Sequence, residues 1–491
     1  MDMNAIIKAI GKTPSLATLP LRVEEGYLPA LLTQSGGAMR ALGAAMLRRE
    51  TDRPLFVLCT DETNAGTLAA DLEALLGESA VQLTGRDLAL RDVEVVSRQE
   101  EQRRLRSLDA MLSGAAVTVC TVSGLLQRTL SPELLESAAF TLKTGEGEGP
   151  EALEPRLLAC GYRRSDMVEG PGQFSRRGGI LDIFSPGAER PIRCEFWGDE
   201  IDSMGFFDTD TQRRTENVES FRILPACEAL MEPNRVETIA KSLENRANRA
   251  EKREQTELSR RLRRDAEMLR GGSALPWCDR YLPEMYAGFS TALDYIAPDA
   301  LVYIDAPNRC AEKAKELSDA LTDDLKILRE GAFPVDETGD YILLWKDACE
   351  RLADFAVVMA DAFSAGRYPL APRSVLDTNV RQLPSYGGSA ETALADVQRY
   401  LENDFCVVVF ASDERRADVL FGMLERNGIS PLRGFPNGAL PPEGWATVAV
   451  GALSAGLEAP EAHLAVLTDT QIAAGALRSR KRRRAMADRE K

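Results

Sequence analysis

The chain has 491 residues, of which 44% are hydrophobic, and this length is too great for one ordinary core, so we expect three or four domains. Its net charge of −16 argues against wrapping of nucleic acid over the whole surface, although a local basic patch remains compatible with it. The nine cysteines form no C-x-x-C pair and His463 is the single histidine, which argues against disulfides and zinc and indicates a cytoplasmic protein. No apolar run reaches about 18 residues, so we expect no membrane span.

The first part of the chain alternates between strand and helix patterns. Residues 29–48 predict a strand, a glycine-containing turn and a helix. Residues 54–61 predict a buried strand, and residues 64–77 a helix that ends at a glycine. Residues 115–126 predict another apolar strand that leads into a loop. This alternation is typical of an α/β domain with a largely parallel sheet.

The pattern changes after a glycine- and glutamate-rich connector at 144–152. Residues 172–225 predict several short strands with tight turns, as in a small antiparallel sheet. Residues 235–270 are highly charged with apolar residues at helical spacing, which predicts one long helix or a helical pair. Strand and helix patterns return at 300–310, and residues 347–390 are mixed and loop-rich.

A second α/β pattern closes the chain. Residues 405–413 predict a buried strand, residues 414–428 an amphipathic helix, and residues 446–453 and 463–469 two further strands. The run at 478–484 contains six cations among seven residues, which is typical of a solvated linker or tail.

The turn after the first strand lies where a phosphate-binding loop would be expected. That loop needs G-x-x-x-x-G-K-[ST], because backbone amides hold the phosphates, the lysine neutralises their charge and the hydroxyl binds Mg²⁺. Here the degenerate loop consists of Ser35, Gly36, Gly37 and Ala38, with Gly37 at the lysine position and Ala38 at the hydroxyl position. Arg40 lies inside the following helix and lacks the required geometry. We therefore expect no ATP hydrolysis at this turn.

The segment GQFSRRGGILDIFSPGAERPIRCEFWGDEID, residues 172–202, closely resembles a module shared by the excision-repair protein UvrB and the bacterial transcription-repair coupling factors. Its departures from the shared pattern are Ser185, Cys194 and Trp197. A UvrB protein is expected to carry an intact phosphate-binding loop followed by helicase motifs, and this sequence lacks both. Residues 276–305 and 400–470 instead resemble the N-terminal region of the coupling factors (Mfd).

This resemblance implies an α/β multidomain protein in which a small, mainly antiparallel β domain is inserted into an α/β domain with a degenerate phosphate loop. The implied segments are the first half of a UvrB-like α/β domain (1–140), a β-rich docking domain for UvrA (141–227), the second half of the α/β domain (228–345), a connector (346–385), a small α/β third domain (386–470) and a basic linker (471–491).

Within the strand predicted around Ile192, alternation places Arg193, Glu195 and Trp197 on one face. The pattern alone leaves two interpretations open: a tryptophan packed under a loop beside solvated arginines, or a protein-binding hot spot. The resemblance favours the second and implies that Arg177, Arg193 and Trp197 bind UvrA.

The resemblance further implies that this region recruits UvrA for nucleotide excision repair at stalled RNA polymerase. We expect no enzymatic activity, no cofactor, no metal and no membrane contact in this chain. ATP and Mg²⁺, RNA polymerase and double-stranded DNA are implied for translocase motor and other domains of the full-length family, which we expect to be missing here. The alternatives are a UvrB-like fragment, a residual nucleotide hydrolase, or a DNA-binding module that uses residues 235–270 or 478–484.

Overall fold

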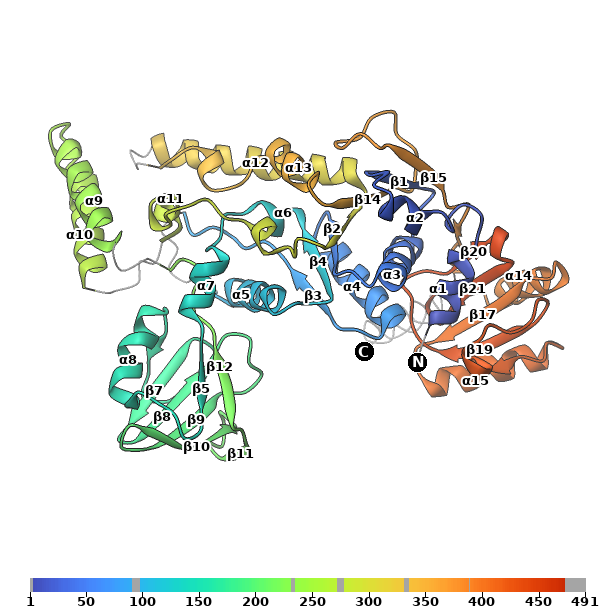
Figure 1. Cartoon of the computed structure of the whole chain (residues 1–491), viewed down its shortest axis with the longest axis horizontal. Coiled ribbons are helices and arrows are strands. Elements are labelled where there is room, and N and C mark those ends of the chain that lie inside the picture. The colour runs from blue at the N-terminus through green and yellow to red at the C-terminus, as the bar shows by residue number, and fades with distance from the viewer. Residues whose placement is uncertain are drawn as a thin grey trace, which may run out of the picture.

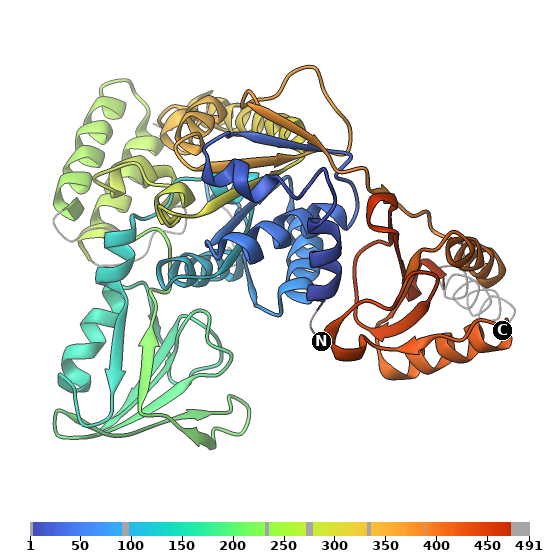
Figure 2. The ribbon, with the colours of Figure 1, turned by 45° about the vertical axis from the view of Figure 1, so that its right-hand side comes forward.

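The computed structural model describes residues 3–90, 98–230, 235–271, 278–330, 335–387 and 389–472. The chain folds as an α/β multidomain protein, which confirms the predicted fold class. Figures 1 and 2 show a central α/β body, a β-rich domain that hangs from one end and a smaller α/β domain at the other. No helix in the described ranges is long and apolar enough to cross a membrane.

The central body is built on a parallel sheet of seven strands in the order β15-β1-β14-β13-β2-β4-β3. Its central strands are short and buried on both faces, which explains their predominantly apolar sequences. Their bounds are β1 Ala30–Thr33, β2 Leu55–Cys59, β3 Ala80–Leu83, β4 Val117–Thr121, β13 Leu301–Asp305, β14 Ala356–Ala360 and β15 Ser374–Asp377. The predicted parallel sheet is therefore confirmed.

Helices cover both faces of this sheet. The predicted helix after residue 62 is α4, in which the Asp61 side chain accepts a hydrogen bond from the Asn64 amide and Gly77 ends the helix at φ 70°. The helices of the body are α1 Asn4–Gly11, α2 Leu19–Glu24, α3 Met39–Thr51, α4 Glu62–Leu76, α5 Gln99–Leu112, α6 Val122–Leu126, α7 Pro132–Ala138, α11 Leu282–Met285, α12 Pro307–Glu330 and α13 Trp345–Leu352.

Two sequence-based expectations need correction in this body. The expected loop after β4 is the helix α6, because the Thr121 hydroxyl accepts a hydrogen bond from the Gly124 amide and caps it. The expected connector at 346–385 contains α13 and two strands of the main sheet. Strand β14 lies between β1 and β13, where its apolar run is buried, so this stretch completes the sheet rather than linking domains.

The small domain is the predicted antiparallel unit. Its six strands have the order β11-β10-β9-β8-β7-β6 and all neighbours are antiparallel except β6 and β7. Helix α8 (Gly149–Ala159) contributes Leu153 and Leu157 to its core. A separate pair of strands, β5 Phe140–Lys143 and β12 Ser220–Ile223, carries the chain into and out of it. The sheet strands are β6 Arg163–Arg164, β7 Gln173–Arg177, β8 Ile180–Phe184, β9 Ile192–Trp197, β10 Glu200–Phe207 and β11 Arg214–Asn217.

The C-terminal α/β domain has a second six-stranded sheet in the order β16-β20-β21-β17-β19-β18. Its core is continuous with the central body, because Ile6 and Ile10 of α1 belong to the same buried cluster as Val408 and Phe410. Its elements are β16 Arg381–Gln382, α14 Ala390–Glu402, β17 Cys406–Ala411, α15 Glu414–Arg426, β18 Leu432–Arg433, β19 Ala446–Val450, β20 Leu457–Ala459 and β21 Leu464–Thr468. The basic run at 478–484 lies outside the described residues.

The charged region after residue 235 forms a helical pair, α9 Val236–Glu251 and α10 Thr256–Arg270. This hairpin projects from the end of the body that also carries the small domain (Figures 1 and 2).

Candidate functional site

Strand β9 of the small domain separates buried from exposed side chains as alternation predicts. Ile192 and Cys194 point into the core and have no exposed surface, whereas the side chain of Trp197 is 85% exposed. Burial raises the pKa of the Cys194 thiol to about 12. Arg193 and Glu195 lie on the same face as Trp197.

On the face of the small-domain sheet that carries Arg193, Glu195 and Trp197, two arginines contact Asp182 of β8, whose side chain has no exposed surface. Arg193 donates from Nε to Oδ1 at 2.7 Å and from Nη2 to Oδ2 at 2.9 Å. Arg177 donates from Nη2 to Oδ2 at 2.9 Å. One carboxylate thus holds two guanidinium groups, which leaves one unit of positive charge at the surface of the sheet.

Strand pairing explains why these three side chains meet. Asp182 is directly opposite Arg193 in the antiparallel pair of β8 and β9, so both side chains emerge from the same face. Arg177 is opposite Ile180 at the end of β7, one pleat further along that face. The pairing of the three strands therefore brings two of the sequence-predicted residues together on a carboxylate that the prediction did not include.

The two arginines differ in how far they are available to a partner. The Arg193 side chain is 15% exposed, donates to the Gln212 carbonyl at 3.1 Å and lies 4.6 Å from the centre of the Phe207 ring. Hydrogen bonding to Asp182 raises its pKa, so it stays charged. The Arg177 side chain is 49% exposed. Arg193 is thus largely part of the domain's own structure, and Arg177 retains donors that face solvent.

Trp197 lies at the same end of the sheet as Arg177. The turn after Arg177 is joined to β9 by the Phe196 amide, which donates to the Gly179 carbonyl at 2.8 Å. Trp197 follows directly and pairs with Glu200 across the next turn. An exposed tryptophan at the same end of a sheet as a half-exposed arginine is typical of a protein-binding surface.

The loop that resembles a phosphate-binding loop has a different geometry. It lies between β1 and α3, and Gly37 adopts φ 54°. A Cβ at Gly37 would lie 2.9 Å from the side chain of Gln382 in β16, so this glutamine covers the backbone of the loop. Ser35 is buried, and its amide donates to the Asp361 carbonyl at 2.9 Å.

Arg40, a cation close to this loop, is already paired. Arg40 donates from Nη1 to Asp305 at 2.9 Å and from Nε to the Gly37 carbonyl at 3.2 Å. Burial raises the pKa of Asp305 and outweighs the opposing influence of Arg40. A loop without the lysine and the hydroxyl, covered by a glutamine and flanked by a carboxylate, does not fit a nucleotide triphosphate and its Mg²⁺.

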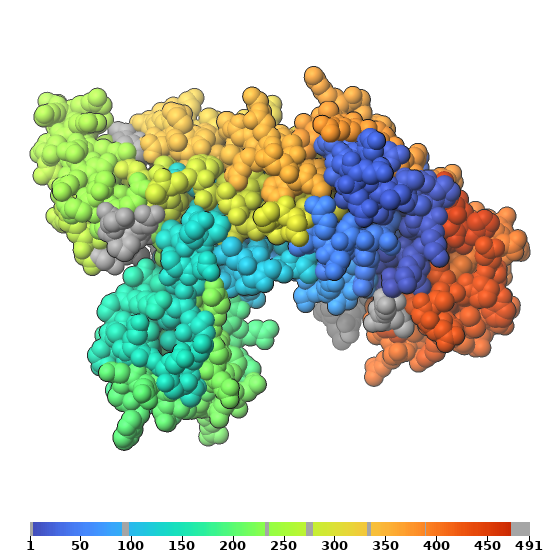
Figure 3. All heavy atoms as spheres, in the orientation of Figure 1, coloured from blue at the N-terminus to red at the C-terminus, as the bar shows by residue number. Residues whose placement is uncertain are grey.

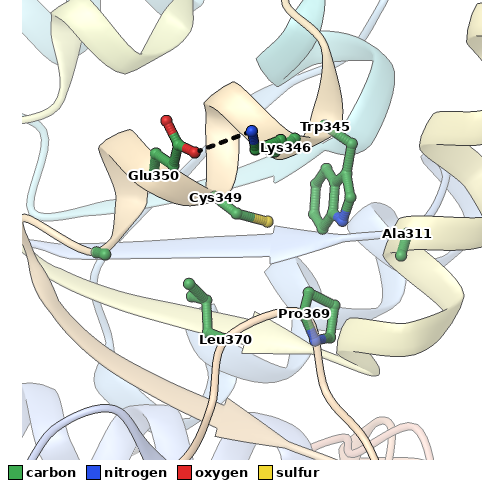
Figure 4. Close-up of a pocket in the computed structure, with 8 residues that line it drawn as sticks. Ala311, Trp345, Lys346, Cys349, Glu350, Pro369 and Leu370 are labelled. Atoms are coloured by element: carbon green, nitrogen blue, oxygen red, sulfur yellow. Dashed lines mark ion pairs between the residues drawn. The ribbon is translucent and has the colours of Figure 1, made fainter.

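A hollow near the main sheet is lined largely by apolar side chains. It has a volume of about 500 Å³ and lies between α12, α13 and the loop before β15 (Figure 4). Trp345, Cys349 and Leu370 line it, with the ion pair of Lys346 and Glu350 at 3.7 Å on α13. Burial raises the pKa of the Cys349 thiol to about 11, so the thiol is protonated and a weak nucleophile at neutral pH.

No cluster of three or more potential metal ligands occurs in the part of the chain that the structure describes. All nine cysteines are free thiols.

A buried ion cluster fixes the point where the chain leaves the small domain. Glu228 has no exposed side-chain surface and accepts hydrogen bonds from Arg104 at 3.0 Å and Arg86 at 3.1 Å. Arg86 also pairs with Asp279 at 2.6 Å. Burial alone would raise the pKa of Glu228, but the two arginines outweigh it and hold that pKa below its usual range. The cluster ties the small domain's exit to both halves of the central body.

Comparison with known proteins finds one family model and a set of curated relatives that resemble this chain. The family model described as the UvrB interaction domain matches residues 140–228. The transcription-repair-coupling factor of Bacillus subtilis is 26% identical over 476 residues, which is 96% of this chain and 40% of that relative. The corresponding proteins of Staphylococcus haemolyticus and Staphylococcus aureus are 25% identical over 91% and 95% of this chain.

The chain spans about 40% of the length of these curated relatives. Most of the chain is thus similar to the N-terminal part of the transcription-repair-coupling factors, and its residues 140–228 match the family model of the UvrB interaction domain.

Proposed function

We propose that the UvrB interaction domain of this chain binds UvrA through Arg177, Arg193 and Trp197. The observation that carries this proposal is the 85% exposure of Trp197 on a sheet whose neighbouring arginines are held by a buried carboxylate. Tryptophan and arginine are among the residues most enriched at binding hot spots.

The arginines have different roles in this proposal. Arg177 offers its solvent-facing donors to a carboxylate of the partner, as arginine–carboxylate pairs are strong and directional. Arg193 contributes by fixing Asp182, and through it the position of Arg177. Because the face is ordered before binding, little side-chain entropy is lost when a partner arrives.

The wider function follows from the relatives, whose name is transcription-repair-coupling factor. We propose that this chain supplies the repair-recruiting part of such a protein, which couples the removal of stalled RNA polymerase to nucleotide excision repair. The ATP- and Mg²⁺-dependent translocation on double-stranded DNA and the contact with RNA polymerase are proposed for the remaining length of the relatives. The chain itself is proposed to need no cofactor and to catalyse no reaction.

The test is a calorimetric titration of the chain with purified UvrA. Trp197→Ala is expected to weaken binding by about 2 kcal/mol, or roughly thirtyfold, as for a central aromatic anchor. Arg177→Ala and Arg193→Ala are also expected to weaken binding. Phe363→Ala is the matched control, because Phe363 is 82% exposed but lies on the central body. Binding of Trp197→Ala with the affinity of the unaltered chain would contradict the proposal.

A competition experiment tests whether the interaction belongs to the shared module. We expect UvrB to displace this chain from UvrA, because the two would use equivalent surfaces. Simultaneous binding of UvrB and this chain to a single UvrA subunit would contradict this. A parallel titration with ATP and Mg²⁺ is expected to give no binding heat, which would separate the docking function from a residual nucleotide site.

A further inference from the structure

The hairpin of α9 and α10 has a charge opposite to that of the chain. Residues 235–271 contain eleven basic and seven acidic side chains, and the part from Arg246 to Arg264, around the turn, contains eight basic and three acidic ones. The whole chain carries −16. Figure 3 shows the hairpin as a knob that stands out from the rest of the surface, so this positive charge is concentrated on a projection.

The base of the hairpin is held firmly against the body. Leu243 and Leu262 are buried in the main core cluster with neighbours from α11. The Tyr281 hydroxyl donates to Asp265 at 2.7 Å, and Arg246 pairs with Glu284 at 2.9 Å. These contacts fix the direction of the hairpin and leave its far end free of the body.

Several cations of the hairpin are used internally. Arg263 pairs with Glu251 at 2.5 Å across the two helices, and Arg260 pairs with Glu257 at 2.7 Å. The side chains of four exposed cations have no ion pair or hydrogen bond with a described residue, and all four lie within about two helical turns of the hairpin turn. They are Arg249, Lys252, Arg253 and Arg264, and we refer to them as the tip cations.

The composition of the hairpin favours one class of polyanion. No aromatic residue occurs between Arg235 and Gly271, so the hairpin lacks the stacking platform that single-stranded nucleic acids need. It also lacks the buried aromatic anchor that a protein partner would need. Binding to the phosphate backbone of a duplex needs only positive charge, spread over a distance that spans several phosphates.

We propose that the tip cations bind the phosphate backbone of double-stranded DNA without reading its sequence. The hairpin and the small domain project from the same end of the body, as Figures 1 and 2 show. In both views the turn of the hairpin points away from the small domain, so a duplex held at the tip would leave the docking face clear. This binding is independent of the docking face and persists if that face binds nothing.

The test measures binding of the full chain to a 20-base-pair fluorescent duplex by anisotropy between about 50 and 200 mM salt. The tip variant carries Arg249→Gln, Lys252→Gln, Arg253→Gln and Arg264→Gln. If each tip cation neutralises one phosphate, the slope of log affinity against log salt becomes shallower by about 3.6. At the lowest salt the tip variant is expected to bind at least about tenfold more weakly.

Two further variants separate the tip from other sources of charge. The charge-matched control carries Lys8→Gln, Arg309→Gln, Lys315→Gln and Lys326→Gln, four exposed cations away from the hairpin that form no ion pair with a described residue. The second variant replaces the six cations of residues 478–484 by glutamine. Both are expected to retain the part of the salt slope that the tip variant loses.

Three results would overturn the proposal. The first is equal loss of binding in the tip variant and the charge-matched control. The second is complete loss in the 478–484 variant with no effect of the tip variant. The third is binding of single-stranded DNA or poly-glutamate as tightly as the duplex, which would assign the tip to another class of partner.

Discussion

Replacement of Asp182 by asparagine tests whether the docking face depends on a carboxylate that no partner can reach. The side chain is fully buried and receives three hydrogen bonds from Arg177 and Arg193. Asparagine has almost the same shape but lacks the charge. The substitution therefore leaves packing intact and removes the charge that holds the two arginines.

The expected cost follows from the burial of the two arginines. Removal of one partner of a buried ion pair costs about 3–5 kcal/mol, because the other charge is left unpaired. Arg177 is about half exposed and can return to water, so its share of the cost is small. Arg193 is 15% exposed and remains largely buried. We therefore expect a loss near the lower end, about 3 kcal/mol, in the stability of the small domain.

Hydrogen exchange measured by mass spectrometry reports this loss locally. Peptides that cover residues 173–207 are expected to exchange roughly 100-fold faster in Asp182→Asn, while peptides that cover β13 do not change. UvrA binding should weaken although Asp182 is not at the surface. The double variant with Arg193→Gln should cost less than the sum of the two single variants, because it removes the unpaired charge. Unchanged exchange in residues 173–207 would refute this account of the face.

Three other predictions concern different parts of the chain. Glu228→Gln is expected to cost about 3–5 kcal/mol, since it leaves two buried arginines without their carboxylate. The pKa of Glu228 is lower in the folded chain than in the unfolded chain. Its contribution to the free energy of unfolding is therefore present above the unfolded pKa of about 4.3 and is lost as pH falls through the lower folded pKa. Glu228→Gln should thus make the stability measured by denaturation fall less steeply with decreasing pH. Gly37→Ala is expected to lower the free energy of unfolding by about 1 kcal/mol or more in thermal or urea unfolding, because φ at this residue is 54° and the new methyl group meets Gln382. Adding Gln382→Ala should recover part of this loss. Equal stability of the single and double variants would contradict the contact between Gly37 and Gln382. Cys194 is expected to resist iodoacetamide at pH 8 in the folded chain, as its pKa is about 12, and its rapid alkylation seen by mass spectrometry would show that the core of the small domain opens.

The parts of the fold that could be predicted are those in which local pattern and burial agree. Strands β2 and β4 are continuous apolar runs because both faces of the parallel sheet are covered by helices. Strand β14 escaped prediction although its sequence, AVVMA, is equally apolar. Its place between β1 and β13 depends on pairing with strands far away in the chain, and no local pattern reports such pairing.

In the candidate site, the exposed face that carries Trp197 could be predicted from the sequence, whereas the buried carboxylate of Asp182 that holds the arginines was not. Alternation along β9 indicates the face from which Trp197 emerges. Asp182 was missed because its role depends on the register between β8 and β9, which the turn between them does not specify. One signal was present: an acidic residue at the centre of the apolar run ILDIF needs a buried partner, and the arginine of IRCEFW is the closest candidate.

The same contrast holds for the degenerate loop. The missing lysine and hydroxyl are visible in the sequence at Gly37 and Ala38. The cover by Gln382 is not, since it depends on how the C-terminal domain packs against the body. Local chemistry was therefore accessible from sequence, whereas contacts made across domains were not.

Site-specific photo-crosslinking to purified UvrA tests the central claim most directly. A photoreactive phenylalanine analogue replaces Trp197 in one sample and Phe363 in a control sample, since the two side chains are 85% and 82% exposed and lie on different domains. We predict a crosslink to UvrA from position 197 and none from position 363, reduced when UvrB is added in excess. Equal crosslinking from both positions, or a crosslink from 363 alone, would contradict the assignment of the docking face to the small domain.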